Sequence, residues 1–263
     1  MTENFEPIKC QACLDGAELP FQFKMAFQPI VSLAHGAVYA QEALCRGPEG
    51  QGAAFVLDQV NPENMYRFDQ AARVRAIETA SRVGIQGSLS INFLPNAVYK
   101  PDTCIQATLE ASERFGFDTN KLIFEVSETE QILEPEHLLG ILKEYRNQGF
   151  MAALDDFGSG YSGLRLLTRF QPDIVKLDRA LIQDIDKNPT KQKIVRNLIS
   201  MGADLGLEIV AEGIETAGEV PRFFAGGLFT LFNHPHKPQN VEHLIVRASH
   251  RIITEAYRSG GGG

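Results

Sequence analysis

Short apolar runs alternate with longer amphipathic segments along the chain. The runs MAFQPIVSL (25–33) and YAQEALCRG (39–47) predict two strands, with Gly36 in a turn between them, so this pair is expected to form a hairpin. Further strands are predicted at SLSINFLP, LIFEVSET, MAALDDF, DIVKLD and LEIVAEG, with a last one near LFTLF. Several of these runs are apolar on both faces, which is typical of a parallel sheet covered by helices.

The amphipathic segments between these runs predict helices. They span 66–83, 102–115, 135–149, 162–170 and 189–206, with a weaker segment at 217–224. Asn61 is the expected N-cap of the first helix, and Gly84 and Gly116 are expected to end the first and second. Because strands and helices alternate, with about eight strands in the chain, the pattern favours an α/β fold of the (β/α)8 barrel class over an open sheet. The predicted hairpin would make the first strand antiparallel.

Polar side chains lie at or near the ends of the apolar runs. Asp155 and Asp156 close one run and are followed at once by the glycine-rich turn FGSGYSG. The other runs carry Glu42, Asn92, Glu125, Glu128, Lys176, Asp178, Glu212 and Glu215. Functional residues of (β/α)8 barrels come from the carboxyl ends of different strands, so these side chains are predicted to form one polar floor.

A group of carboxylates this large predicts a metal site. Carboxylates close together disfavour one another's ionisation unless they are protonated or bridged by divalent cations. The candidate ligands are Glu42, Asn92, Glu125, Asp155 and Asp156. They offer only oxygen atoms, which suits Mg²⁺ or Mn²⁺ and counts against zinc. Adjacent aspartates can share a pair of ions about 4 Å apart, so metal-assisted phosphodiester hydrolysis is the predicted reaction.

Composition and charge limit the kinds of molecule that the protein is expected to bind. The 263 residues are 44% hydrophobic and 22% charged, which predicts one globular domain. The net charge of -8 and a pI near 5.3 argue against DNA or RNA as a partner. No apolar run approaches the ~20 residues of a membrane-spanning helix, and the first residues carry no apolar signal core, so a cytoplasmic protein without membrane contact is expected. Four cysteines do not make a disulfide framework.

Six motifs in order resemble one family. QEALCR, SINFLP, FEVSE, DDFGSG, VKLD and AEGIE are similar to the motifs of EAL-domain phosphodiesterases, which linearise cyclic di-GMP. The resemblance covers about Phe23 to Pro238. It implies metal-dependent hydrolysis of cyclic di-GMP to linear pGpG, which lowers the level of this second messenger, two Mg²⁺ or Mn²⁺ ions, and a homodimer.

The resemblance also implies a role for each matching residue. Glu42, Asn92, Glu125 and Asp155 would bind the first metal, and Asp156 with Asp178 would help to hold the second. Glu212 would hold a metal or its water, and Lys176 would orient or activate the attacking water. Substrate contacts are implied for Gln28, Leu44, Arg46, Glu215 and Asn233, while Glu128 would hold the loop after DDFG. On its own, Lys176 would more often be an ion-pair partner of Asp178 or of a neighbouring acid.

One segment departs from the family pattern. The family has a Gln-Gly pair after the last strand, where this chain has LFTLFNHPHKP, with Asn233 nearest to the glutamine and His234 in place of the glycine. Reduced activity is expected from this change. The alternative function is an impaired EAL domain that acts as a cyclic di-GMP receptor or protein-interaction regulator, and hydrolysis of another phosphodiester is a third interpretation.

The chain ends lie outside the motifs. We expect an N-terminal extension over 1–20, the EAL domain over 21–258 and a flexible glycine tail over 259–263. The extension is too short for a sensor domain. Cys10 and Cys13 form one CxxC, which matches half a zinc site or a redox pair but is interpreted as a structural or incidental feature, while Cys45 and Cys104 are expected in or near the core.

Overall fold

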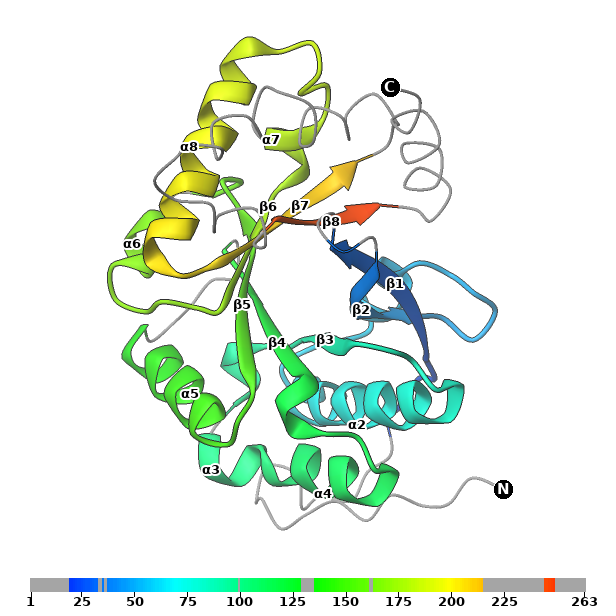
Figure 1. Ribbon diagram of the computed structural model, residues 1–263. Helices are drawn as coiled ribbons and strands as arrows, with labels where there is room; N and C mark the ends of the chain where they lie inside the picture. Colours follow the sequence, from blue (N-terminus) through cyan, green and yellow to red (C-terminus); the bar gives the residue numbers. More distant parts are fainter. Residues whose placement is uncertain are drawn as a thin grey trace. The chain divides into compact units, whose positions relative to one another are not determined.

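A computed structural model describes residues 19–32, 35, 37–98, 100–128, 135–160, 163–214 and 244–248 (Figure 1). The chain divides into two compact units. The first unit comprises Met1–Phe27, Glu42–Phe124 and Gln131–Met151, and the second comprises Gln28–Gln41, Glu125–Glu130 and Ala152–Gly263. Four strands carry residues of both units: β1 (Lys24–Ser32), β2 (Ala37–Arg46), β4 (Leu122–Ser127) and β5 (Met151–Phe157).

Helices make up most of the first unit. Its elements are α1 (Ala53–Leu57), α2 (Met65–Val83), β3 (Ser88–Asn92), the 3-10 turn η1 (Pro95–Ala97), α3 (Pro101–Cys104), α4 (Gln106–Phe115), the 3-10 turn η2 (Thr119–Lys121) and α5 (Pro135–Asn147). Helix α2 packs against α4 and against β3, and Figure 1 shows these elements next to one another. The short helix α1 was not predicted from the sequence.

Glycine ends two of these helices at the predicted positions. Gly84 follows α2 with φ 66°, and Gly116 follows α4 with φ 65°. Both adopt the left-handed conformation that a residue without a Cβ tolerates best, so each glycine stops its helix and the chain turns towards the next strand.

Two details of the helix predictions were wrong. The N-cap of α2 is Asn64, because Asn61 lies one turn earlier and its Oδ1 accepts backbone N–H groups within that turn. The helix predicted over 102–115 is divided at Ile105, which ends α3 and begins α4. Ile105 is fully buried, and the apolar pattern runs through it without a break, so the sequence did not show the division.

Four aromatic side chains form the core of the first unit. Phe124 packs with its ring centroid 4.8 Å from Tyr145, 5.1 Å from Phe150 and 5.9 Å from Phe93. All four are buried. Phe93 follows β3 directly, Phe124 lies on β4 and Phe150 directly precedes β5, so this cluster holds three consecutive strands from one side.

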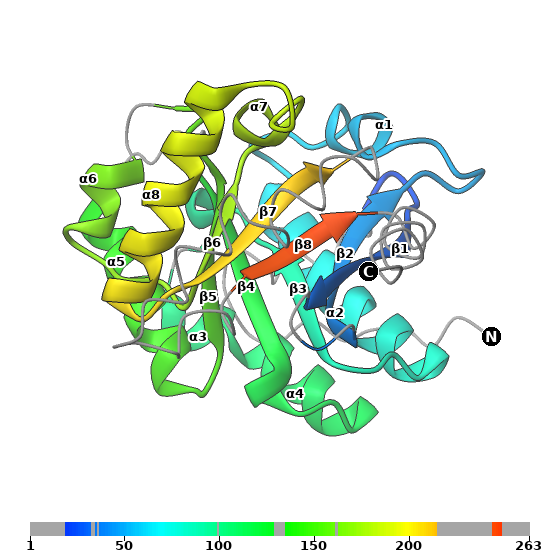
Figure 2. The same cartoon turned by 45° about the horizontal axis from the view of Figure 1, so that its top comes forward.

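Parallel strands dominate the second unit. Its other elements are α6 (Gly163–Leu167), β6 (Ile174–Leu177), α7 (Arg179–Ile182), α8 (Pro189–Leu205), β7 (Glu208–Ile214) and β8 (Leu244–Ala248). Strands β5, β6, β7 and β8 pair in parallel and lie side by side in Figure 2, with α8 against β7. Strand β1 pairs with β8 in antiparallel orientation, which confirms the expected antiparallel first strand.

The fold class is the predicted one. The strands are hydrogen-bonded in chain order from β1 to β8 in a closed barrel, which makes this an α/β fold of the (β/α)8 class. The helix predicted over 162–170 is shorter, and α7 and β8 were not predicted. The strand predicted near 228–232, the helix at 217–224 and the residues of the glycine tail lie outside the described residues.

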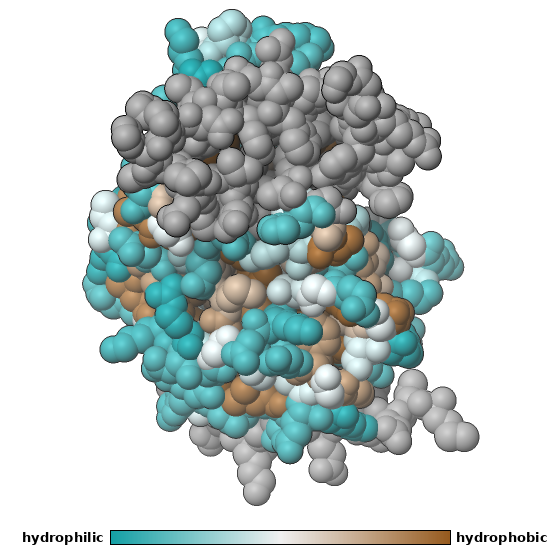
Figure 3. All heavy atoms as spheres, in the orientation of Figure 1, coloured by the Kyte–Doolittle hydropathy of each residue, from teal (hydrophilic) through white to brown (hydrophobic). Residues whose placement is uncertain are grey.

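Hydrophobic side chains reach the surface in separate places. On the face drawn in Figure 3, hydrophobic patches lie between hydrophilic residues. Large exposed hydrophobic side chains include Phe55 on α1, Leu164 on α6 and Ile194 on α8. These lie on three different helices. Within the described ranges, no helix is both long and apolar enough to cross a membrane.

Replacing Phe124 with alanine is expected to lower the free energy of unfolding by about 3–5 kcal/mol, because the ring is fully buried and its removal leaves a cavity between three other rings. Phe55→Ala is the matched control, since this ring is 46% exposed and should cost about 1 kcal/mol or less. Urea unfolding of both variants measures the difference. Equal losses in the two variants would contradict the assigned core.

Candidate metal centre

Lys176 is the centre of a polar cluster in the second unit. Its side chain on β6 is 1% exposed. The Nζ atom donates a hydrogen bond to Glu125 Oε2 at 2.8 Å, and it forms ion pairs with Asp155 Oδ2 at 3.0 Å and Glu212 Oε1 at 2.9 Å. Because the three carboxylates come from β4, β5 and β7, one ammonium group joins side chains of three other strands.

Asp155 and Asp156 form a β-bulge. The register between β5 and β6 shifts at this point, so the two aspartates face the single residue Lys176. Asp156 has φ 56°, a left-handed conformation that is uncommon outside glycine and that concentrates at functional sites. Successive side chains of a regular strand point to opposite faces, but a bulge changes that direction. One carboxylate oxygen each of Asp155, Asp156 and Glu212 therefore lies within 4.8 Å of the others.

Local hydrogen bonds hold this bulge in place. The backbone N–H of Asp156 donates to Asp155 Oδ1 at 2.8 Å, and Ser127 Oγ donates to Asp156 Oδ2 at 2.9 Å. Ser159 Oγ donates to the backbone oxygen of Asp156 at 2.7 Å. Ser127 was not among the predicted site residues, although it follows Glu125 by two residues on the same strand, which is the spacing of side chains that share a face.

A second bulge carries Glu212. The register between β7 and β8 shifts between Ala211 and Ile214, so Glu212 and Gly213 face a single residue of β8. Gly213 has φ 69°, and a Cβ atom there would lie 2.4 Å from Arg179 Cγ. This glycine therefore permits both the left-handed backbone and the close approach of Arg179, and the bulge determines where Glu212 enters the cluster.

Negative charge exceeds positive charge in the cluster. Three carboxylates against one ammonium group leave two negative charges in excess, and Asp156 adds a third. Such an excess is unfavourable at low exposure unless protons or cations neutralise it. The group of Asp155, Asp156 and Glu212 contains no cysteine or histidine. Its donor atoms are all oxygens, so the residues fit hard divalent cations such as Mg²⁺ and Mn²⁺.

Glu128 connects the end of β4 to the loop after β5. Its Oε2 accepts the N–H of Gly158, and its Oε1 accepts the N–H of Gly163, both at 2.7 Å. A Cβ atom at Gly163 would lie 2.8 Å from the Phe157 ring and 2.9 Å from Glu128 Oε2. The two hydrogen bonds need this close approach, so a glycine at 163 is required for Glu128 to reach both ends of the loop.

Four of the predicted site residues belong to the first unit. Glu42 lies on β2 and is 2% exposed, while Asn92 is the exposed last residue of β3. Leu44 and Arg46 follow Glu42 on β2 and are half-buried, and Arg46 donates to the backbone oxygen of Cys45 at 2.8 Å. The structure describes these residues within their own unit, and their predicted roles remain predictions.

The remaining predicted residues have different placements. Gln28 is half-buried on β1, in the second unit. Asp178 is the N-cap of α7, where its Oδ1 accepts the N–H of Ala180 at 2.8 Å, which occupies one of its two carboxylate oxygens. The described residues do not include Cys10, Cys13, Gly36, Glu215, Asn233 and His234.

The chain belongs to the EAL domain family, whose model matches residues 19–228. The blue light- and temperature-regulated antirepressor BluF of Escherichia coli K12 is 28% identical over 195 residues, which cover 74% of this chain and 48% of BluF. PdeG of the same strain, named "Probable cyclic di-GMP phosphodiesterase", is 30% identical over 222 residues, which cover 80% of this chain and 42% of PdeG. The chain thus spans less than half the length of both relatives.

Solved structures extend the comparison to the fold. A standalone EAL protein from Vibrio cholerae O395, in its c-di-GMP bound form, is 40% identical with a TM-score of 0.75, covering 87% of this chain and 91% of that one. BlrP1 of Klebsiella pneumoniae, in a manganese and cyclic di-GMP complex, is 34% identical with a TM-score of 0.74, covering 88% of this chain and 56% of that one. These likenesses support the same fold class.

Replacing Lys176 with methionine is expected to destabilise the metal-free protein at pH 8 by about 3–5 kcal/mol, because Glu125, Asp155 and Glu212 lose the buried ammonium group that pairs with all three. Thermal unfolding in EDTA measures this loss.

Lys187→Met is the matched control for that variant. Lys187 pairs with Asp184 at 2.9 Å, but the two side chains are 73% and 59% exposed, so solvent screens this pair and its loss should cost far less stability than the loss of Lys176. If Lys176→Met behaves like Lys187→Met, the cluster does not depend on the buried ammonium group.

Proposed function

We propose that this chain is a metal-dependent phosphodiesterase that hydrolyses cyclic di-GMP to linear pGpG and so lowers the level of that second messenger. The β-bulge that brings Asp155 and Asp156 to one side, within 4.8 Å of Glu212, carries the proposal. Closely spaced carboxylates on parallel strands are suited to metal-assisted attack on a phosphodiester. The substrate is supported by the relative PdeG and by the Vibrio cholerae EAL protein in its c-di-GMP bound form.

Two divalent ions, Mg²⁺ or Mn²⁺, are the proposed cofactors. The ligands would be Glu42, Asn92, Glu125 and Asp155 for the first ion, with Asp156 and Asp178 for the second. When bound, the ions supply a more acidic water and neutralise charge on the phosphoryl oxygens. The oxygen-only group of carboxylates and the manganese complex of BlrP1 support this assignment.

Lys176 and Glu212 are the proposed catalytic residues. In the reaction, the oxygen of water forms a bond to phosphorus, the bond from phosphorus to the 3′ oxygen breaks, and a proton ends on the new 3′ hydroxyl. Lys176 Nζ would orient the attacking water, because its three carboxylate partners hold the ammonium group in one place. Glu212 would hold that water and accept its proton from the β7 side.

Other residues would bind the substrate. Arg46 would contact a phosphate, for which a guanidinium fork is well suited. The further substrate contacts would be Gln28, Leu44, Glu215 and Asn233, and Glu128 would hold the loop after β5 through its two backbone hydrogen bonds. The proposal includes a homodimer and a cytoplasmic location, where a nucleotide messenger is made and consumed.

Purified protein with cyclic di-GMP and Mn²⁺ is expected to release pGpG, which chromatography separates from the cyclic substrate. EDTA should stop the reaction. Asp155→Asn is expected to lower the rate at saturating substrate by about 100-fold or more, because it removes one proposed ligand charge and one partner of Lys176. Lys187→Met should keep the wild-type rate. No pGpG from folded, Mn²⁺-loaded wild type would refute the proposal.

The second candidate function is a cyclic di-GMP receptor or a protein-interaction regulator with impaired catalysis. The relationship to the antirepressor BluF favours it, as does Asn233 where the family has a Gln-Gly pair. A calorimetric titration beside the turnover assay separates the two functions. Binding of cyclic di-GMP without product would establish the receptor, whereas product that accumulates over many turnovers would exclude it.

A further inference from the structure

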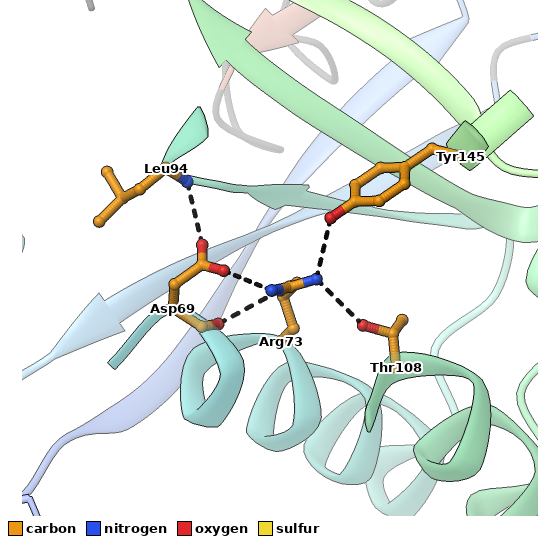
Figure 4. A network of polar contacts seen from close by, with 5 residues as sticks. All are labelled: Asp69, Arg73, Leu94, Thr108 and Tyr145. Atoms are coloured by element: carbon orange, nitrogen blue, oxygen red, sulfur yellow. Dashed lines mark hydrogen bonds and ion pairs between the residues drawn. The ribbon is translucent and has the colours of Figure 1, made fainter. Parts of the chain in front are cut away.

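A buried polar network in the first unit connects three helices to the end of β3 (Figure 4). Asp69 and Arg73 lie one turn apart on α2 and form an ion pair, with side chains 2% and 1% exposed. Arg73 also donates to Tyr145 Oη on α5 at 3.2 Å and to Thr108 Oγ1 on α4 at 3.4 Å. The other carboxylate oxygen of Asp69 accepts the backbone N–H of Leu94 at 2.9 Å.

The bond to Leu94 holds the chain directly after Asn92. Ile91 and Phe93 are 2% and 4% exposed, whereas Asn92 between them is exposed, so the strand presents Asn92 away from the core. Phe93 packs 5.6 Å from the Tyr145 ring. One residue further on, Asp69 holds the backbone of Leu94. The backbone that follows Asn92 is therefore held by two contacts, the packing of Phe93 on Tyr145 and the hydrogen bond from Leu94 N–H to the buried carboxylate of Asp69. These contacts determine the direction of the Asn92 side chain.

We propose that Asp69 is a positioning residue that orients Asn92 through the N–H of Leu94. The inference rests on the proposed function, in which Asn92 is a metal ligand. A buried ion pair by itself is weak evidence for stability, because desolvation offsets the Coulomb attraction. An apolar pair in the same space could not supply the bond from Leu94 N–H to Asp69, and residues that orient metal ligands tune metal affinity.

The geometry makes Asp69→Asn a selective variant. An asparagine has only one acceptor oxygen in its side chain, and the charged Arg73 competes for it with the neutral N–H of Leu94. Charge-assisted hydrogen bonds are the stronger ones, so the oxygen should turn to Arg73 and leave the NH₂ group facing Leu94 N–H. Adding Arg73→Met removes the competitor, and the amide oxygen can then turn back to Leu94.

Tyr145→Phe is the control within the same network. Burial raises the pKa of Tyr145 to about 12, so its hydroxyl is neutral at neutral pH and accepts from Arg73. The variant removes that acceptor, keeps the ring against Phe93, and leaves the bond between Asp69 and Leu94 intact. It disturbs the network without disturbing the end of β3.

Manganese binding tests the proposal. The dissociation constant for Mn²⁺, measured from free Mn²⁺ by electron paramagnetic resonance, should rise about tenfold or more in Asp69→Asn and stay within about twofold in Tyr145→Phe. The double variant Asp69→Asn, Arg73→Met should recover affinity to within about threefold of wild type. Equal affinity in wild type and Asp69→Asn, or no recovery in the double variant, would overturn the inference.

A second pair of variants keeps the test valid if Asp69→Asn alone does not fold. Asp69→Asn with Arg73→Met and Asp69→Ala with Arg73→Met both lack the buried charges, and they differ in the acceptor for Leu94 N–H. The alanine pair should bind Mn²⁺ about tenfold more weakly than the asparagine pair. Equal binding of the two double variants would overturn the positioning role.

Hydrogen exchange at Leu94 separates this inference from the proposed function. The Leu94 amide should exchange faster in Asp69→Asn than in wild type or Tyr145→Phe, and slow again in the double variant with Arg73→Met. If wild type binds no Mn²⁺, the proposed function fails, while the exchange rates still decide whether Asp69 holds this segment. Unchanged exchange of Leu94 in Asp69→Asn would overturn the inference by itself.

Discussion

The carboxylates around Lys176 repel one another, and one buried ammonium group balances only part of their charge. Lys176 meets Glu125, Asp155 and Glu212 at 2.8–3.0 Å, and each of these acids comes from a different strand. The ammonium group therefore lowers the electrostatic cost of placing acids from β4, β5 and β7 close together. The charge that remains in excess favours cations, so the repulsion that limits stability also supports the proposed binding of metal ions.

Backbone irregularity places these acids. A regular strand would send Asp155 and Asp156 to opposite faces, but the bulge in β5 gives both of them access to one side. The left-handed conformation of Asp156 costs backbone energy, and hydrogen bonds from Ser127 and Ser159 hold it. A second bulge in β7 places Glu212. In β5 and β7, the acids therefore lie where regular strand pairing is interrupted.

The buried polar groups of the two units differ in how their charges are balanced. The cluster around Lys176 carries an excess of negative charge, whereas Asp69 and Arg73 pair with each other and with the polar groups around them. The acids by themselves are the basis for proposing metal-assisted phosphoryl chemistry. Membership in the EAL domain family, and the cyclic di-GMP complexes among similar structures, support the proposed substrate, which the acids alone do not specify.

The sequence by itself determined the order of strands β1 to β7 and of the longer helices, the glycines that end α2 and α4, and the set of polar residues at strand ends, because periodicity and helix stops are local properties. Only the tertiary structure decided that Lys176 meets three acids, that both bulges occur where they do, and that Asp69 bonds to Leu94. It also showed β8 at Leu244–Ala248, which the apolar pattern did not predict. Register shifts and buried pairs depend on segments far apart in the chain, and no local pattern records which of them will meet.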